Sequence, residues 1–210
     1  MGDAMGKLDI KRERKALYAA PSDRFVFVDV PALDFLMMDG AGDPNVSPDY
    51  AAAVEALYSV AYTLKFMVKR EDGTDYVVPP LEGLWWADDP AVFVTRDKAA
   101  WRWTMMICVP VAIPPATVGR AIAQAAARKP DLPLDRLRCE TWTEGRSVQR
   151  LHIGPYDQEG PVLEQLHRVF LPDNGLTFAG HHHEIYLSDP RRTAPEKLRT
   201  ILRQPVRSAR

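Results

Sequence analysis

The residues best suited to chemistry are a carboxylate and a phenol near the C-terminal end of the chain. Glu184 and Tyr186 lie two positions apart in residues 183–187, which read as a short strand that ends at a Ser-Asp-Pro turn signal. Because side chains alternate along a strand, Glu184 and Tyr186 share one face, and Ile185 and Leu187 can serve a core on the other. The polar pair needs water, a partner or a ligand, so both a solvated face and a binding site remain open.

Two roles are open for Glu184. In apolar surroundings a carboxyl group can act as a general acid or base near neutral pH. Held ionised beside aromatic rings, the same group would instead attract a cation. The sequence does not decide between moving a proton and holding a charge.

Aromatic residues supply the second signal. The carboxylate of Glu82 stands in apolar surroundings, and aromatic walls beside a carboxylate suit a planar, hydrophobic and often cationic molecule. Burial in the core is the alternative for each tryptophan. Trp85 and Trp86 are adjacent in a predicted strand, so they face opposite ways and at most one lines a given wall. The aromatic residues considered are Trp85, Trp86, Trp101, Trp103, Trp142, Tyr76, Tyr156 and Tyr186.

Metal and cofactor motifs are not found. His181, His182 and His183 would point in alternating directions on a strand, so they cannot converge on one ion without a bend. Cys108 and Cys139 match no metal or redox spacing. The sequence contains no nucleophile elbow, phosphate-binding loop or dinucleotide fingerprint. We therefore expect neither a metal site nor a cofactor.

Composition indicates a soluble globular protein. The 210 residues are 46% hydrophobic and 26% charged, and 27 Lys and Arg balance 28 Asp and Glu. No basic excess indicates nucleic-acid binding. No apolar run approaches the roughly 20 residues of a membrane helix, and the charged N-terminal segment does not resemble a signal peptide. We expect a bacterial cytoplasmic protein that binds neither nucleic acid nor a membrane, with its oligomeric state open.

Periodicity gives the order of elements. Ser47 and Pro48 are expected to start a long amphipathic helix that ends at Gly73, the strongest periodic segment in the chain. Residues 1–24 are expected to form an N-terminal arm or a short leading helix, and residues 25–207 a single domain. Further helices are expected from 114 to 130, after 157 and after 193. Strands are expected at 25–30, 35–38, 74–78, 81–86, 101–109 and 183–187, with a hairpin of 137–143 and 147–153 around a Glu-Gly-Arg turn.

The two ends of this layout resemble each other. Strand, glycine turn, helix and strand follow in that order in residues 35–79 and again in residues 149–190. Two such units on a mostly antiparallel sheet give an α+β domain. A pseudo-twofold arrangement of this kind leaves a cleft between the halves, where ligands are commonly bound.

Five sequence motifs are specific when taken together. They are Met38-Asp39-Gly40-Ala41-Gly42-Asp43-Pro44-Asn45, Leu57-Tyr58-Ser59-Val60-Ala61-Tyr62, Pro80-Leu81-Glu82-Gly83-Leu84-Trp85-Trp86, His152-Ile153-Gly154-Pro155-Tyr156 and His182-His183-Glu184-Ile185-Tyr186-Leu187-Ser188-Asp189-Pro190-Arg191. Together these motifs resemble the stand-alone GyrI-like (gyrase-inhibitor-like) small-molecule-binding proteins, and the resemblance covers roughly residues 8–207. It implies a duplicated strand-helix-strand-strand module with helices on one face of the sheet and a ligand cleft between the repeats.

This resemblance implies binding of planar hydrophobic or cationic xenobiotics in an aromatic cleft. A subset of the family are cyclopropanoid cyclopropyl hydrolases, which open the cyclopropane of DNA-alkylating compounds and so protect the cell. Glu184 matches the pocket glutamate of the family's Glu-Ile-Tyr motif, and with Tyr186 it is the expected catalytic pair. Non-catalytic binding, sequestering or sensing is the alternative, and no motif supports a protein partner. The expected ligand-binding residues are Trp86, Trp103, Tyr76, Tyr156 and Glu82.

Overall fold

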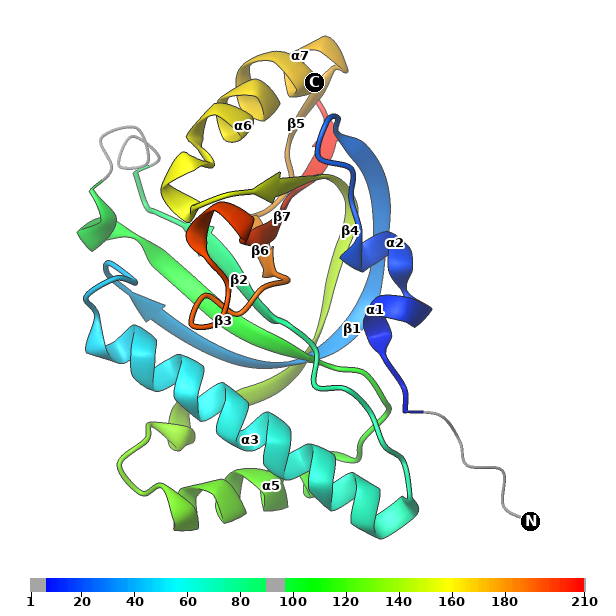
Figure 1. The fold of residues 1–210 in the computed structure, drawn as a ribbon, viewed down its shortest axis with the longest axis vertical. Coiled ribbons are helices and arrows are strands. Elements are labelled where there is room, and N and C mark those ends of the chain that lie inside the picture. The colour runs from blue at the N-terminus through cyan, green and yellow to red at the C-terminus, as the bar shows by residue number, and fades with distance from the viewer. Residues whose placement is uncertain (1–6, 90–96, 210) are drawn as a thin grey trace. The chain divides into compact units, whose positions relative to one another are not determined.

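The structure is a computed structural model that describes residues 7–89 and 97–209 (Figure 1). The chain divides into two compact units, each assembled from segments that are separate in the sequence. The first unit contains Met1–Glu13, Leu33–Pro79 and Trp86–Trp142. The second unit contains Arg14–Ala32, Pro80–Trp85 and Thr143–Arg210.

Helix α3 (Pro48–Asp72) dominates the first unit and confirms the strongest prediction from periodicity. The Ser47 hydroxyl accepts a hydrogen bond from the Tyr50 backbone N–H at 3.3 Å, and Gly73 ends the helix in the left-handed conformation with φ 79°. By length and composition α3 could cross a membrane, but half of its apolar window is buried inside the protein, as in a core helix. The helix therefore serves as the core element of its unit.

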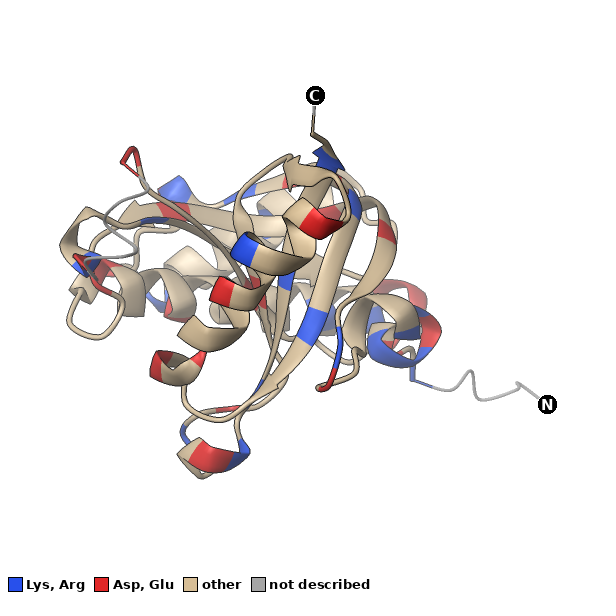
Figure 2. Ribbon diagram, turned by 90° about the horizontal axis from the view of Figure 1, so that it is seen from above, with Lys and Arg blue, Asp and Glu red and all other residues tan. Residues whose placement is uncertain are grey.

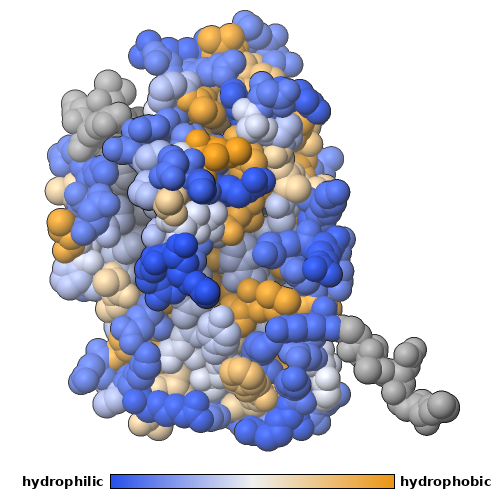
Figure 3. Space-filling view, viewed as in Figure 1, coloured by the Kyte–Doolittle hydropathy of each residue, from blue (hydrophilic) through white to orange (hydrophobic). Residues whose placement is uncertain are grey.

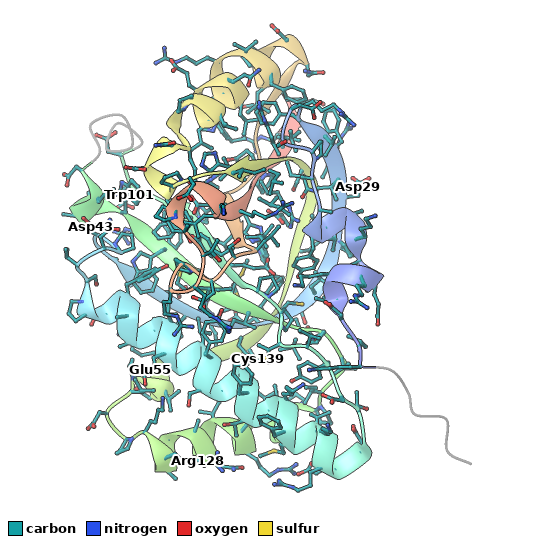
Figure 4. The ribbon with its side chains drawn as sticks, in the orientation of Figure 1. Asp29, Asp43, Glu55, Trp101, Arg128 and Cys139 are labelled. Carbon is teal, nitrogen blue, oxygen red and sulfur yellow. The ribbon has the colours of Figure 1, made fainter. Side chains whose placement is uncertain are left out.

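Helix α5 (Pro115–Arg128) lies beside α3, as Figure 1 shows. Glu55 on α3, labelled in Figure 4, forms an ion pair of 2.7 Å with Lys129, which caps α5. Strand β3 (Arg102–Val109) packs against α3 and pairs antiparallel with the end of β1 (Val26–Ala41). The predicted second helix and the predicted strand at 101–109 are both confirmed.

Two strands run through positions where the sequence indicated breaks. Strand β1 continues through Pro31, so the prediction of two separate strands is wrong. Proline ends a strand only where its missing N–H is needed for the ladder. Strand β4 (Arg138–Ile153) likewise continues through Gly145, so the predicted hairpin is wrong. Gly145 has φ 76°, a conformation that bends a strand locally without reversing it.

Two further predictions of secondary structure are wrong. Residues 74–78 form no strand among the described residues, and Tyr76 contributes only a single parallel bridge to Leu8. The last predicted helix is instead a short 3₁₀ turn, η5 (Pro195–Lys197), followed by strand β7 (Arg199–Ser208). The apolar pattern after 193 fits a buried strand as well as a helix, because short apolar runs do not distinguish the two.

The second unit is built around β7. Strand β7 pairs antiparallel with β6 (His182–Tyr186), with β4 and with the short strand β5 (Leu176–Phe178). On its other edge β6 pairs antiparallel with β2 (Leu81–Trp86). The strands predicted at 81–86 and 183–187 are therefore confirmed, with β6 one residue earlier at each end.

The third predicted helix is present in the second unit as a series of short pieces. These are η3 (Tyr156–Gln158), α6 (Gly160–Gln165), the π-helical turn η4 (Leu166–Phe170) and α7 (Leu171–Asp173). Leu166 and Leu171 from these pieces form an apolar cluster with Val148 of β4 and Val206 of β7. This cluster fixes the helical pieces to the sheet of the second unit.

The N-terminal segment carries two short helices. Helix α1 (Ile10–Glu13) belongs to the first unit, and α2 (Lys15–Tyr18) belongs to the second. Leu17 and Tyr18 of α2 are buried, so this segment contributes to the core of the second unit. In Figure 2, Lys and Arg are interspersed with Asp and Glu along the helices, in line with a net charge of −1.

Helices combined with antiparallel strand pairs confirm the predicted α+β class. Figure 3 shows a face on which hydrophilic residues surround separate hydrophobic patches. Phe66 on α3 in the first unit, and Val169 and Phe178 in the second, are among the exposed large hydrophobic residues. The ligand cleft between the repeats stays a prediction.

Candidate functional site

Strand β6 separates two sets of polar groups by the alternation of its side chains. Glu184 and Tyr186 are on one face, and His183 and Ile185 are on the other. Ile185 is 0% exposed, which confirms its predicted place in the core, whereas Leu187 follows the strand and is half-buried; His183, on the same face as Ile185, is also 0% exposed. The two faces have different chemistry.

A chain of hydrogen bonds holds Glu184. The Tyr186 hydroxyl donates to Glu184 Oε2 at 2.8 Å, and the Trp85 indole N–H donates to the Tyr186 oxygen at 3.0 Å. The Tyr156 ring packs edge-on against Tyr186, with centroids 5.7 Å apart. The Glu184 side chain is only 15% exposed. The Glu184 carboxylate is therefore mostly buried and held among aromatic side chains, and the Tyr156 ring, which is 39% exposed, leaves this face partly open.

Glu159 is a second carboxyl group at this face. It directly precedes α6, makes no side-chain capping hydrogen bond and is 4% exposed. Burial, and next the negative charge of Glu184, raise the pKa of Glu159 to about 10. Glu159 is therefore protonated near neutral pH.

Three buried polar side chains around Glu184 have atoms without a hydrogen-bond partner in the described residues. They are Glu159 at Oε1, Thr200 at its hydroxyl and His182 at both ring nitrogens. His182 Nε2 lies 3.6 Å from Glu184 Oε1, beyond hydrogen-bond distance. Buried polar atoms without partners are uncommon in proteins. Their concentration here indicates a place where a polar ligand or water would bind.

The strand register explains the arrangement. Thr200 of β7 is opposite Tyr186, and directly opposite residues in an antiparallel pair share a face. On the other edge, Gly83 of β2 is opposite Glu184 and places no side chain there. We call this group the Glu184 face, and it consists of Glu184, Tyr186, Trp85, Tyr156, Glu159, His182 and Thr200.

The opposite face of β6 carries a closed ionic network. His183 Nε2 is 3.0 Å from Glu82 Oε2, and His183 Nδ1 is 3.0 Å from Glu144 Oε1. Arg203 of β7 pairs with Glu144 at 3.1 Å. The four side chains are between 0% and 2% exposed. Two acidic groups are thus buried against two basic ones.

Neutral groups complete this network. The Tyr18 hydroxyl donates to Glu82 Oε1 at 2.9 Å, and Arg203 Nε donates to Gln149 at 3.0 Å. Arg203 also donates to the backbone oxygen of Leu17. We call this group the His183 network, and it consists of His183, Glu82, Glu144, Arg203, Tyr18 and Gln149.

The charges in the His183 network stabilise one another. Burial acts to lower the pKa of His183, but the adjacent Glu144 and Glu82 outweigh it and raise that pKa. Burial acts to raise the pKa of Glu144, but His183 and Arg203 outweigh it and lower that pKa. The pairing therefore favours the ionised forms of His183 and Glu144 despite burial.

The structure brings together part of the predicted site. Glu184, Tyr186 and Tyr156 lie together at the Glu184 face. Glu82 does not join them, because β2 directs it to the opposite face, where it pairs with His183.

The remaining predicted residues, Trp86, Trp103 and Tyr76, belong to the first unit. Trp103 is 0% exposed, and its ring packs so closely on Gly40 that a Cβ there would lie 2.1 Å from a ring carbon. Tyr76 is 2% exposed, and burial raises its pKa. Trp86 is half-buried. A ligand-binding role for these three residues stays a prediction.

Reasoning from sequence missed Glu159, Thr200 and the unpartnered state of His182. Glu159 stands before a Gly-Pro pair at the start of a helix, where acidic residues are common for reasons unrelated to a site. Thr200 was expected in a helix and not in a strand. Within residues 7–89 and 97–209, no group of three or more His, Cys, Asp or Glu is arranged to hold a metal ion.

The family model of the GyrI-like small molecule binding domain matches residues 24–207, which is most of the chain. The chain belongs to the GyrI-like family. This assignment confirms the resemblance drawn from the motifs, and it establishes the protein as a member of a small-molecule-binding family.

Solved structures agree with this assignment. An uncharacterized conserved protein from Listeria innocua is 40% identical, with a TM-score of 0.87 over 96% of this chain and 100% of that one. A protein described as a hydrolase from Listeria innocua is 38% identical, with a TM-score of 0.82 over the same shares. The C-terminal domain of EcmrR is 11% identical with a TM-score of 0.55 over 89% of this chain and 98% of that one, and it shows the fold alone. No curated protein matches the chain.

Proposed function

We propose that this GyrI-like protein binds planar hydrophobic or cationic xenobiotics and hydrolyses those that carry a strained electrophilic ring, such as the cyclopropane of DNA-alkylating compounds. The observation that supports it is the enclosed carboxylate of Glu184, held by Tyr186 among aromatic side chains. The similarity to a protein described as a hydrolase adds support. Such an activity would protect the cell from these compounds.

In this proposal Glu184 is the general base. It takes a proton from a water molecule while the water oxygen forms a bond to a carbon of the strained ring. The strained carbon–carbon bond breaks, and its electron pair passes into the conjugated system of the substrate. Strain supplies much of the driving force, so modest acid–base help from the protein is sufficient.

Tyr186 is a positioning residue in this scheme. Its hydroxyl donates to Glu184 and accepts from Trp85, so it fixes the orientation of the carboxylate. The Tyr156 ring, packed against Tyr186, extends the aromatic wall beside Glu184. Removing the Tyr186 hydroxyl would therefore misplace the base without deleting it.

Turnover of a cyclopropane-containing alkylator by wild type, Glu184→Gln and Tyr186→Phe tests the proposal. Loss of a general base commonly lowers the rate about 10²-fold or more, and loss of the positioning hydroxyl should have a smaller effect. Glu164→Gln is the matched control, because the Glu164 side chain is 62% exposed on α6. Among the described residues its one salt bridge is with Arg168. Equal turnover by all four proteins would refute the hydrolytic role of Glu184.

A second candidate function is binding without chemistry. The negative charge of Glu184 beside the Tyr156 and Tyr186 rings favours an aromatic cation. Quenching of tryptophan fluorescence by an aromatic quaternary ammonium compound would report the affinity. A tenfold loss of affinity in Glu184→Gln, with no turnover by wild type, would favour this function over hydrolysis. Unchanged affinity would exclude the counter-charge role.

A further inference from the structure

Glu159 and Glu184 approach the same face of the second unit from different elements. Glu184 belongs to β6, whereas Glu159 comes from the start of α6, the element that follows β4. Strand β4 pairs with β7, and β7 pairs with β6, so the turn after β4 reaches the face that carries Glu184. Tyr156, three residues before Glu159, packs edge-on against Tyr186 with ring centroids 5.7 Å apart, so this segment lies beside the residue that hydrogen-bonds Glu184.

The surroundings give the two carboxyl groups different properties. Glu184 has a hydrogen bond from Tyr186 and is 15% exposed. Glu159 is 4% exposed, and its Oε1 has no hydrogen-bond partner in the described residues. Acidic groups face Glu159 from two elements, Glu184 on β6 and Asp157 on η3, and the neutral Thr200 faces it from β7. In the part of the chain that the structure describes, the charged groups that act on the pKa of Glu159 are both acidic.

We propose that Glu159 is a second catalytic residue of the Glu184 face and serves as its proton donor. The proton would go to the oxygen of a carbonyl group conjugated to the strained ring. This inference rests on the proposed function and adds a substrate requirement, namely a basic oxygen at the far end of the conjugated system.

The reaction balances with one water molecule. Glu184 takes a proton from water as the water oxygen bonds to the ring carbon, and the strained carbon–carbon bond breaks. Its electron pair moves through the conjugated system to the carbonyl oxygen, which takes the proton of Glu159. The proton on Glu184 then returns to Glu159 through solvent, so both groups are restored.

The environment of each group suits its role. A protonated carboxyl group beside an ionised one provides an acid and a base in the same site at one pH. Burial and the charge of Glu184, which raise the pKa of Glu159 to about 10, keep its proton available at neutral pH. His182, whose buried ring nitrogens have no hydrogen-bond partner in the described residues, and Thr200, which lies beside Glu159, would hold the water or the substrate oxygen.

Turnover by Glu159→Gln is the decisive measurement. Glutamine keeps the size of the side chain but cannot give up a proton at neutral pH, so kcat should fall about 10²-fold with little change in KM. Glu159→Asp keeps the acid with a shorter reach and should recover part of kcat. Glu164→Gln, on the same helix, should equal wild type. Wild-type kcat in Glu159→Gln would overturn the donor role and leave the base role of Glu184 intact.

Infrared difference spectroscopy tests protonation of Glu159 without turnover. The spectrum of wild type minus Glu159→Gln at pH 7 should contain the C=O band of a neutral carboxylic acid. In Glu184→Gln this band should titrate at lower pH, because the neighbouring negative charge is gone. Absence of the band at pH 7 would overturn the inference. Failure of the proposed function would appear separately, as absence of turnover by wild type itself.

Discussion

A pair of carboxyl groups lies at each of the two faces of β6. The two pairs differ in their contacts with basic side chains. In the His183 network, Glu82 and Glu144 each contact a basic side chain within 3.1 Å. At the Glu184 face, within residues 7–89 and 97–209, no basic side chain contacts Glu159 or Glu184 that closely, and His182 Nε2 lies 3.6 Å from Glu184 Oε1. His183 and Glu184 are neighbours in β6, but His183 belongs to a network of paired charges and Glu184 to a face with unpaired polar atoms.

The difference indicates where the protein uses polar groups for stability and where it leaves them for a ligand. A buried ion pair is costly to break, because the remaining charge keeps its desolvation penalty. Buried polar atoms without partners lower stability and are retained mainly at functional sites. We therefore expect substitutions in the His183 network to destabilise the protein and some at the Glu184 face to stabilise it.

The largest effect is expected from Arg203→Met. This change removes the charge that pairs with Glu144 and leaves the acceptor oxygens of Glu144 and Gln149 unmatched, at a cost of about 3–5 kcal/mol in the free energy of unfolding. Urea denaturation monitored by circular dichroism measures it. Arg207→Met on the same strand is exposed and should change stability little. Equal losses in both variants would contradict the assigned importance of the network.

Glu159→Gln is expected to increase the free energy of unfolding, in contrast to Arg203→Met. The pKa of Glu159 is about 10 in the folded protein against 4.5 as its ordinary value. The unfolded chain therefore releases this proton at lower pH, and wild-type stability falls as pH rises from about 4.5 towards 10. Glutamine removes this dependence.

The glutamine variant should be more stable than wild type by on the order of 3 kcal/mol at pH 7, with a smaller difference at pH 5. Urea denaturation of both proteins across this pH range provides the measurement. A difference that does not grow with pH would refute the raised pKa of Glu159.

The same substitution, tyrosine to phenylalanine, can be made at both faces of β6 and allows a direct comparison. Tyr18→Phe removes the donor to the buried Glu82, and Tyr186→Phe removes the donor to the partly exposed Glu184. The first should cost roughly 1.5–3 kcal/mol and the second roughly 0.5–1.5 kcal/mol, because water can replace a lost partner only at the more open face. Thermal unfolding of both variants decides the order, and a reversed order would mean that the Glu184 face is the more closed one.

Some residues of the site could be predicted from sequence patterns and others could not. The alternation of β6 placed Glu184 and Tyr186 together because it follows from backbone geometry alone. Glu159 is 25 positions from Glu184 in the sequence, and only the pairing of β4, β7 and β6 brings their faces together. Glu82 had the right chemistry for a ligand, but its place in β2 directs it to His183.

The sequence by itself determined the family, the long helix α3 and the orientation of β6, because motifs, caps and periodicity are local properties. It failed at Pro31, at Gly145 and after Pro195, where strand partners far away in the chain outweigh local turn and helix signals. Only the tertiary structure decided which carboxyl groups are paired and which are left open, because burial and ion pairing depend on neighbours that the sequence does not place.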